Sequence, residues 1–525
     1  MGSATHPLLT PRSPSAQPIH GDSWEWRLTL IVLAVVALRT SLFLVAAWPH
    51  TTDDAYITLR YARHLAEGVG LLWNAGEAPV EGYSNFLFVL LGTGVMRSGT
   101  ANPMLVLKAL GVMALLGSGV LTFFIGRRWL GPAAATVPVL LLSGYSGTVL
   151  WAVSGLETSV YQFLVLMAVF LVLQAEDRRE ASHRRSLLIA AGVTGFLLSL
   201  TRPEGPVVVL VLLIYVAFSF NEEGRRLSVR SLNWVKVPFL SLYLPYTAWR
   251  ILYFGRFLPN SVACKAGHTA APFDLVSDFL AFAWIYVALA VLGLLFRREA
   301  RHLLLWGLPA AYLLILYNVD PIMSHHNRHF LAALPFVLIM ATIGLQRLVG
   351  FSESLRASWA GSSLVTVIVL VGAVMSFSAV SSDIHQTASH GQPPEAPRLA
   401  LGKYLKGQLA PDDVYVIGDS GLVPFVAGGR TIDAYCLNCR EATSPVIDRS
   451  PERLADWIFG QRPRFIIIQS FQSEQLTPVW SADIALATHS ALASEYGRIR
   501  SFGDKEDVFH YFLYERNATR LGDST

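Results

Sequence analysis

Long apolar segments recur along the chain up to Val380 and then stop. A helix of about 20 apolar residues covers the ~30 Å hydrocarbon core of a bilayer, and most of these segments approach that length. The pattern therefore predicts about eleven transmembrane helices. They are expected over 28–48, 103–126, 132–150, 157–175, 186–200, 203–220, 235–254, 275–296, 302–318, 330–349 and 361–380.

One further apolar segment, over 84–96, is too short to cross a bilayer comfortably, and we expect it to be re-entrant or half-immersed. The distribution of Arg and Lys supports this interpretation, because cytoplasmic loops are enriched in these residues. With the N-terminus in the cytoplasm, the basic loops all lie inside: Arg127–Arg128, 177–185, 222–230, 297–301, Arg347 and Arg356. A full crossing at 84–96 would move every later basic loop to the outside.

After Val380 the pattern becomes that of a soluble domain in which strands and helices alternate. Strands are predicted over 414–419, 429–435, 464–470 and 508–516, and helices over 398–409 and 451–461. Such an alternation is typical of a small α/β sheet. The predicted fold class is a polytopic α-helical membrane protein with a C-terminal α/β extracytoplasmic domain. Its parts are a disordered cytoplasmic N-terminus (1–27), a transmembrane module (28–380) and the soluble domain (381–525).

Composition agrees with a membrane protein. Hydrophobic residues make up 53% of the chain and charged residues 15%, whereas soluble domains carry about 25% charged residues. The net charge of +4 mostly reflects basic loops, so we expect no nucleic-acid partner. Among the cysteines, Cys264 stands alone. Cys436 and Cys439 form a CxxC, which is compatible with a small-loop disulfide, a redox pair or a chance spacing.

Two adjacent aspartates, Asp53 and Asp54, stand where the first predicted span leaves the membrane. One of them can cap the amphipathic helix expected to follow, which carries Arg60 on its polar side and ends at Gly68. A cap needs only one carboxylate. A second carboxylate raises the pKa of its neighbour by repulsion and so favours proton abstraction. The pair is therefore a candidate general base, and a cap with a solvated neighbour is the alternative.

The rest of this first outer loop, predicted over 49–83, combines aromatic and acidic side chains. Trp73 and Tyr83 accompany Glu77 and Glu81. Aromatic rings stack on the C–H face of a sugar while carboxylates accept its hydroxyls. Anchoring of the aromatic rings at the membrane interface is an equally good interpretation.

Further ionisable residues lie in the later outer loops, where they face the same side as the acidic pair. They are Glu157, Arg202, Glu204, Lys265, His326 and Arg328. Ionisable residues near a membrane are costly and are more often functional than elsewhere. Arg and Lys contact phosphate oxygens directly, so the cations predict a phosphate site.

Each of these residues also has a structural interpretation. Glu157 can compensate a helix N-terminus, Arg202 and Glu204 can form a mutual salt bridge, and Arg328 can reach the interface as a snorkelling side chain. A metal bound by the histidines around His326 is less favoured, because no carboxylate or second cluster has ligand spacing to them.

Carboxylates and cations that gather on one membrane face suit the transfer of a group from a lipid-linked phosphate to a hydroxyl outside the cytoplasm. A carboxylate deprotonates the acceptor, and the cations stabilise the phosphate as it leaves. A transporter or flippase for lipid-linked saccharides is one alternative, although such proteins usually place charges near the midplane and carry internal repeats. A non-catalytic envelope assembly protein is the other, and it would not need paired aspartates.

The motifs in their order also resemble those of a known family. The segments DDAYITLRYARHLAEGVGLLWNAGE, PVEGYSNF, SGLETSVY, TRPEG and LPNSVACK are similar to segments of GT-C superfamily polyprenyl-phosphate-dependent glycosyltransferases. The branch they resemble contains the mycobacterial terminal arabinofuranosyltransferase and its bacterial relatives. The resemblance covers most of residues 40 to 350.

The resemblance implies a GT-C-like membrane module, a polyprenyl-phosphate sugar donor, possible transfer of arabinofuranose, and an extracytoplasmic glycan, lipid or protein acceptor, as in cell-wall biogenesis. It implies a bacterial plasma membrane location with the active site outside the cytoplasm. Asp53 and Asp54 become the catalytic pair, with Asp53 slightly preferred as the base. The expected donor-phosphate ligands are Lys265 and Arg202, with His326 and Arg328 weaker. The expected substrate-binding residues are Arg60, Trp73, Glu81, Tyr83, Glu157 and Glu204. A divalent cation, Mg²⁺ or Mn²⁺, on the acidic pair stays open.

Overall fold

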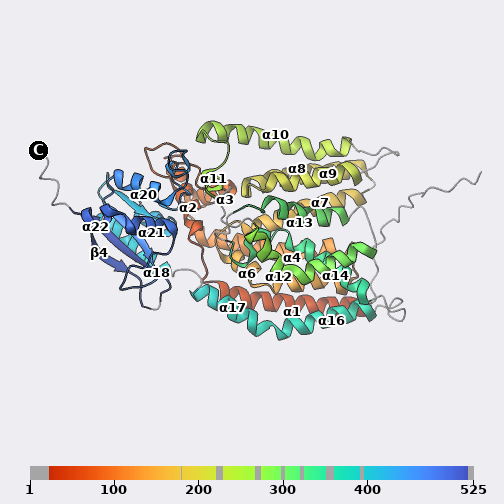
Figure 1. Ribbon diagram of the computed structural model, residues 1–525. Coiled ribbons are helices and arrows are strands. Elements are labelled where there is room, and N and C mark those ends of the chain that lie inside the picture. Colours follow the sequence, from red (N-terminus) through yellow and green to blue (C-terminus); the bar gives the residue numbers. More distant parts are fainter. Residues whose placement is uncertain are drawn as a thin grey trace, which may run out of the picture.

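The computed structural model describes residues 23–178, 180–219, 229–265, 273–296, 302–319, 324–349, 360–390, 395–505 and 507–517. Most of the N-terminal segment predicted to be disordered lies outside these ranges, as do most of the basic loop 222–230, the whole of the loop 297–301, and Arg356. The remainder folds into a bundle of helices with a sheet domain at one end (Figure 1).

A helix lies at every predicted span, and many of these helices run side by side (Figure 1). They are α1 (Ser23–Ala47), α4 (Pro103–Gly126), α5 (Pro132–Ser143) with α6 (Ser146–Val153), α7 (Thr158–Asp177), α8 (Ala181–Thr201), α9 (Gly205–Ser219), α10 (Val229–Phe254), α12 (Asp274–Phe296), α13 (His302–Ile315), α14 (Leu334–Val349), and α16 (Ala360–Met375) with α17 (Phe377–His390). Within the described ranges, 4 helices are long and apolar enough to cross a membrane, or up to 6 if each bent pair counts as one span. The predicted number of spans stays a prediction, whereas the helical membrane fold class is confirmed.

Two of the predicted spans are broken helices. The axes of α5 and α6 meet at 62°, and the second pair, α16 and α17, is bent by 47°. Gly144 ends α5, its N–H bonding back to Leu140, and α6 restarts at Ser146. This break turns α6 toward the loops that carry the polar motifs, because α6 contacts the short 3-10 helix η1 (His325–Phe330).

The segment between α1 and α4 contains two short helices, α2 (Asp54–Ala66) and α3 (Phe86–Ser98). The 13 residues of α3 make a helix of about 20 Å, shorter than the ~30 Å core of a bilayer. α2 packs against α3, and both lie with the small helix α11 (Asn260–Lys265) at the end of the bundle that faces the sheet domain (Figure 1). The half-immersed position of segment 84–96 stays a prediction, and the short length of α3 is consistent with it.

The C-terminal domain is a five-stranded mixed sheet of order β2-β1-β3-β5-β4. The strands are β1 (Val414–Ile417), β2 (Arg430–Asp433), β3 (Phe465–Ser470), β4 (Tyr496–Phe502) and β5 (His510–Arg516). β1 pairs in parallel with β2 and β3, whereas β5 runs antiparallel to β3 and β4. The predicted α/β domain is confirmed. The edge strand β4 was not predicted, because most of its middle residues are exposed and polar and show no apolar alternation.

Helices cover both faces of this sheet. Tyr415 and Ile417 of β1 face a core that includes Leu401 of α18 (Glu395–Gln408) and Val423 of α19 (Leu422–Ala427). Val416, between them, faces the opposite core, beneath α20 (Pro451–Gly460), α21 (Ser481–Thr488) and α22 (Ser490–Glu495). Because successive side chains of a strand point to opposite faces, β1 contributes residues to the hydrophobic core on each side of the sheet.

A disulfide between Cys436 and Cys439, one of the three interpretations left open for the CxxC, does not form. Cys436 forms a disulfide with Cys264, 172 residues earlier, and Cys439 is a buried free thiol. The pairing follows from packing, because the side-chain amide of Asn260 donates to the carbonyl oxygens of Cys436 (2.8 Å) and Leu437 (3.0 Å). These bonds bring α11, and with it Cys264, against the C-terminal domain.

Candidate active site

The polar motifs converge where the helical bundle meets the sheet domain. Glu157 lies at the N-cap of α7, in the turn that follows α6, and is almost completely buried. Its carboxylate accepts hydrogen bonds from Asn85 (3.0 Å) and Arg328 (2.9 Å), and Arg202 lies 3.6 Å from it. Burial would raise the pKa of Glu157, but Arg328 and Arg202 hold it below its ordinary value. Glu157 is therefore an ionised centre that joins three loops.

Arg328 is held in a fixed position by groups around Glu157. Its Nε donates to the hydroxyl of Thr158 (3.0 Å), and its guanidinium lies 4.7 Å from the centre of the Trp151 ring. Both contacts come from α6 and the start of α7, which the α5–α6 break brings to η1. Arg328 therefore forms a buried ion pair with Glu157 and does not snorkel to the membrane interface.

Arg202, at the C-cap of α8, is paired on two sides. It donates to Glu204 (3.2 and 2.9 Å) and to Nδ1 of His329 (2.7 Å). Burial would lower the pKa of Arg202, but Glu204 and Glu157 raise it above its ordinary value. The salt bridge that the sequence offered as an alternative for Arg202 and Glu204 is present.

His329 is a member of this site that sequence reasoning did not select. Burial, together with Arg202, Arg328 and Lys265, lowers its pKa well below the ordinary value, so the ring is neutral. Because an arginine can only donate, Nδ1 of His329 is the acceptor, and its proton is on Nε2. Three histidines in HHNRHF gave no sequence signal that distinguished this one.

Asp54 and Lys265 are the two charged side chains of the site that remain unpaired. Within the described ranges, neither the carboxylate of Asp54 nor the ammonium of Lys265 forms a hydrogen bond or an ion pair. Burial lowers the pKa of Lys265. The charge of Asp54 acts in the opposite direction and raises it, whereas the charge of Arg328 lowers it further, so both groups lie close enough to act on Lys265 electrostatically. Thr58, one turn after Asp54 on the same helix face, donates to Asn85 (3.0 Å), the residue that bonds Glu157.

Asp53 points in another direction, toward the C-terminal domain. Its two carboxylate oxygens accept the backbone N–H groups of Gly421 (2.7 Å) and Leu422 (2.9 Å), and Nε of Arg398 lies 3.4 Å away. A Cβ on Gly421 would lie only 2.1 Å from the carbonyl oxygen of Asp53, so this approach requires glycine. The two aspartates thus have separate surroundings, and Asp53 attaches the domain to α2.

Arg60 and Trp73 also lie at this domain interface. The guanidinium of Arg60 donates to the carbonyl oxygens of Pro424 (2.5 Å) and Gly429 (2.8 Å) and lies 4.6 Å from the centre of the Trp73 ring. Asn74, the next residue, accepts from the N–H of Thr431 (3.1 Å) and donates to its carbonyl oxygen (3.0 Å), as a neighbouring strand would. Arg60 and Trp73, both predicted from the sequence to bind substrate, therefore lie at the domain interface and not around Glu157.

Glu81 and Tyr83 form a third group, against α10. The carboxylate of Glu81 accepts from Arg250 at 2.6 Å, and its backbone oxygen accepts from Asn260 at 2.9 Å. Burial raises the pKa of Glu81 to about 7, although Arg250 lowers it. The buried Tyr83 ring packs edge-on against Tyr61 at 4.8 Å, and its hydroxyl has no hydrogen-bond partner among the residues that the structure describes.

His326 turns away from the residues around Glu157. Its ring nitrogens lie 3.5 Å from the hydroxyl of Ser146 and 3.3 Å from that of Thr387 on α17, and Asp383 is 3.9 Å away. A positive φ of 50° at His326 produces this turn within η1. His326 and His329 therefore contact different groups of residues.

The acidic pair does not suit a cation site built from both carboxylates. A divalent cation needs several free oxygen ligands, whereas both oxygens of Asp53 already accept backbone N–H groups. Across the described ranges, no three His, Cys, Asp or Glu side chains are grouped as metal ligands. We route no step through a metal.

Comparison with known proteins finds one family profile that matches the C-terminal domain and several structures with a similar fold. A family profile described as a domain of unknown function (DUF8728) matches residues 383–516. No curated protein matches the sequence. The structure is similar to ArnT from Cupriavidus metallidurans bound to undecaprenyl phosphate, with a TM-score of 0.61 and 14% identity, over 95% of this chain and 99% of that one.

Two further similarities are to an oligosaccharyltransferase and an arabinofuranosyltransferase. The oligosaccharyltransferase of Archaeoglobus fulgidus tethered with an acceptor peptide matches with a TM-score of 0.54 and 12% identity, over 85% of this chain and 69% of that one. The arabinofuranosyltransferase AftD from Mycobacteria matches over 92% of this chain but 41% of that one, with 15% identity and a TM-score of 0.48. The chain therefore shares its overall fold with ArnT and with the archaeal oligosaccharyltransferase, which is the GT-C-like membrane fold that the motif resemblance implied.

Proposed function

We propose that this protein is an integral membrane glycosyltransferase that moves a sugar from a polyprenyl-phosphate donor to an acceptor outside the cytoplasm. The GT-C fold supports this, because the similar structures include ArnT bound to undecaprenyl phosphate and an archaeal oligosaccharyltransferase in complex with a dolichol-phosphate. The mixed acidic and basic site at the domain end of the bundle supports it independently.

The observation that carries the proposal is the unpaired state of Asp54 and Lys265 within a site whose other charges are matched. Arg328 pairs with Glu157 and Arg202 pairs with Glu204. Among the side chains of this site that the structure describes, the ammonium of Lys265 is then free to meet a phosphate and the carboxylate of Asp54 is free to act as a base on a hydroxyl.

The proposed reaction is a single displacement. Asp54 accepts the proton of the acceptor hydroxyl as its oxygen forms a bond to the anomeric carbon of the donor sugar. The bond between that carbon and the phosphate oxygen breaks at the same time, and polyprenyl phosphate leaves with the electron pair. Lys265 and the Nε2–H of His329 stabilise the charge that develops on the phosphate. Attack opposite the leaving group inverts the anomeric centre.

Arg202 and Arg328 take part mainly by shaping this site. Glu157 fixes both guanidinium groups, and Asn85 connects Glu157 to the helix of Asp54. Each guanidinium has N–H donors beyond those in its ion pairs, and we assign those to the donor phosphate.

The assignment of the base differs from the one the sequence slightly preferred. Asp53 is bonded to the backbone of the C-terminal domain, so Asp54 is the better candidate. We assign Asp53, Arg60 and Trp73 to holding the domain and the first outer loop in place. Glu81 stays a substrate-binding candidate through its contact with the Asn260 helix. Tyr83 stays one through its hydroxyl, which has no partner among the described residues.

We further propose that the catalytic end of the bundle and the C-terminal domain lie outside the cytoplasm of a bacterial cell. The disulfide between Cys264 and Cys436 supports this orientation, since disulfides persist in oxidising compartments. The motif resemblance makes decaprenyl-phospho-arabinose the first donor to test.

The test is reconstitution of the purified protein in vesicles with a panel of polyprenyl-phosphate sugars, followed by measurement of released polyprenyl phosphate. We expect release from one donor class by the wild type and a donor KM raised at least tenfold by Lys265→Ala. Lys403→Ala, which removes an exposed lysine of α18, is the matched control and should leave KM unchanged. No release from any donor by well-folded protein would contradict the proposal.

A further inference from the structure

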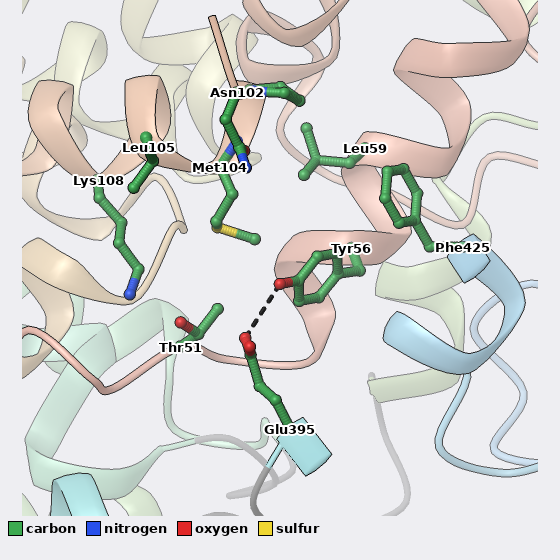
Figure 2. A pocket seen from close by; sticks show the side chains of 10 residues that line it. Thr51, Tyr56, Leu59, Asn102, Met104, Leu105, Lys108, Glu395 and Phe425 are labelled. Carbon is green, nitrogen blue, oxygen red and sulfur yellow. Dashed lines mark hydrogen bonds between the residues drawn. The ribbon is translucent and has the colours of Figure 1, made fainter. Parts of the chain in front are cut away.

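A pocket of about 510 Å³ opens between the membrane module and the C-terminal domain. Its walls come from the loop before α2, from α2, from the start of α4 and from the domain helices α18 and α19 (Figure 2). The volume lies within the ~300–1,000 Å³ of small-molecule sites. The pocket shares no lining residue with the group around Glu157 and Lys265.

The lining combines hydroxyl, acidic, basic and aromatic groups. Figure 2 shows the hydroxyl of Tyr56 directed at the carboxylate of Glu395, to which it donates at 3.0 Å. The Tyr56 ring lies 5.5 Å from that of Phe425. Thr51 adds a hydroxyl and Lys108 an ammonium. Aromatic faces beside hydrogen-bonding groups suit a hydroxylated, sugar-like ligand.

Lys108 has a donor left for such a ligand. Its ammonium donates to the carbonyl oxygens of Trp48 (2.9 Å) and His50 (3.0 Å). An ammonium carries three N–H donors, so one remains. The first two bonds hold the chain segment that leads from α1 to the acidic pair, which fixes this wall of the pocket.

One edge of the pocket continues into the lipid-facing side of α4. Leu105 lines the pocket and is 52% exposed. Large apolar side chains of similar exposure follow it at helical spacing along the same helix: Met113, Leu116, Val120 and Phe124. In a bilayer this stripe faces acyl chains, so a ligand that enters the pocket from the membrane keeps its tail on α4.

We infer that this pocket seats the glycosyl head group of a membrane-anchored acceptor, with the lipid tail along α4. The inference rests on the proposed function, because it names the class of acceptor. Thr51 and Tyr56 flank the acidic pair in sequence, so a head group seated between them lies within about one helical turn of Asp54 along the chain. A sugar hydroxyl that extends beyond the pocket can then approach the base.

The test is photo-crosslinking in phosphatidylethanolamine/phosphatidylglycerol vesicles, without donor. The probe is dodecyl glucoside with a diazirine near the glycosidic oxygen, and a diazirine dodecanol without sugar is the comparison. We expect glucoside adducts on residues 102–108 and near Phe425, whereas the alcohol should label α4 along its whole stripe. Glu395→Gln, Tyr56→Phe and Leu105→Ser should each weaken the glucoside adducts at least fivefold.

Leu116→Ser is the matched control, since Leu116 is as exposed as Leu105 (52% each) but lies outside the pocket. It should leave the glucoside adducts unchanged. Equal labelling by glucoside and alcohol, or adducts insensitive to Glu395→Gln and Tyr56→Phe, would overturn the inference. So would displacement by a diazirine phosphatidylethanolamine probe that itself labels 102–108, because the occupant would then be a phospholipid. Binding here needs no turnover, so failure of the glycosyltransferase proposal is detected separately, by donor release.

Discussion

Cys264 and Cys436 form a disulfide that joins the helix of Lys265 to the C-terminal domain. Cys264 directly precedes Lys265, and Asn260 on the same helix bonds to backbone carbonyls around Cys436. The proposed phosphate ligand is therefore positioned by a domain that begins more than a hundred residues later in the chain. In the proposed function, this arrangement gives the C-terminal domain a part in donor binding.

Removal of the disulfide should accordingly weaken donor binding. Cys264→Ser should raise the donor KM several-fold with a smaller effect on kcat, because Lys265 becomes mobile while Asp54 is untouched. It should also lower the free energy of unfolding by roughly 2–5 kcal/mol, the range for loss of a native disulfide. Steady-state kinetics in vesicles and thermal unfolding in detergent measure the two effects.

Cys439→Ser is the matched control, because Cys439 is a buried free thiol in the same loop. It should leave the donor KM within about twofold of the wild type, because its thiol donates to Glu441 in the same loop (3.6 Å), a contact that a serine hydroxyl can keep, and does not join the two domains. An equal rise of KM in both variants would show that local packing, and not the disulfide, positions Lys265.

The ion pairs of Glu157 give a prediction about stability. Glu157→Ala leaves two buried guanidinium groups, those of Arg328 and Arg202, without their shared carboxylate. Loss of one partner of a buried pair costs about 3–5 kcal/mol. Glu204→Ala should cost less, because Glu204 is more exposed and Arg202 retains Glu157. Thermal unfolding of both variants tests this order, and a larger cost for Glu204→Ala would contradict it.

The pH dependence of donor capture should reflect Lys265. Burial lowers its pKa below the ordinary value of 10.5. As the pH rises through that lowered pKa, the ammonium loses its charge and kcat/KM for the donor should fall earlier than an ordinary lysine would allow. The kcat/KM profile reports the free enzyme. Lys265→Arg, which stays charged, should remove this alkaline fall, and an identical profile in the variant would assign the fall to another group.

Much of the architecture could be predicted from hydropathy alone. The apolar segments gave the helices of the bundle, because burial in lipid requires long apolar runs. The breaks between α5 and α6 and between α16 and α17 were not anticipated, although Ser143 and Gly144 interrupt the first apolar segment and Ser376 interrupts the second. Strands β1, β3 and β5 were found because their apolar side chains alternate or run continuously.

The candidate site was predicted as a set of residues but not as an arrangement. Glu157, Arg202, Arg328 and Lys265 do gather at one end of the bundle. The role of Asp53 depends on Leu422, 369 residues away, and no local pattern indicates a contact over such a separation. The same limit applies to Cys264 and Cys436.

The most direct test of the account compares the two aspartates at saturating donor. Asp54→Asn should lower kcat at least a hundredfold, the contribution typical of a general base, with little change in unfolding temperature. Asp53→Asn should instead destabilise the domain contact by about 1–3 kcal/mol, with kcat reduced far less in the folded protein. Near-normal kcat in Asp54→Asn, or loss of turnover only in Asp53→Asn, would contradict the assignment of Asp54 as the base.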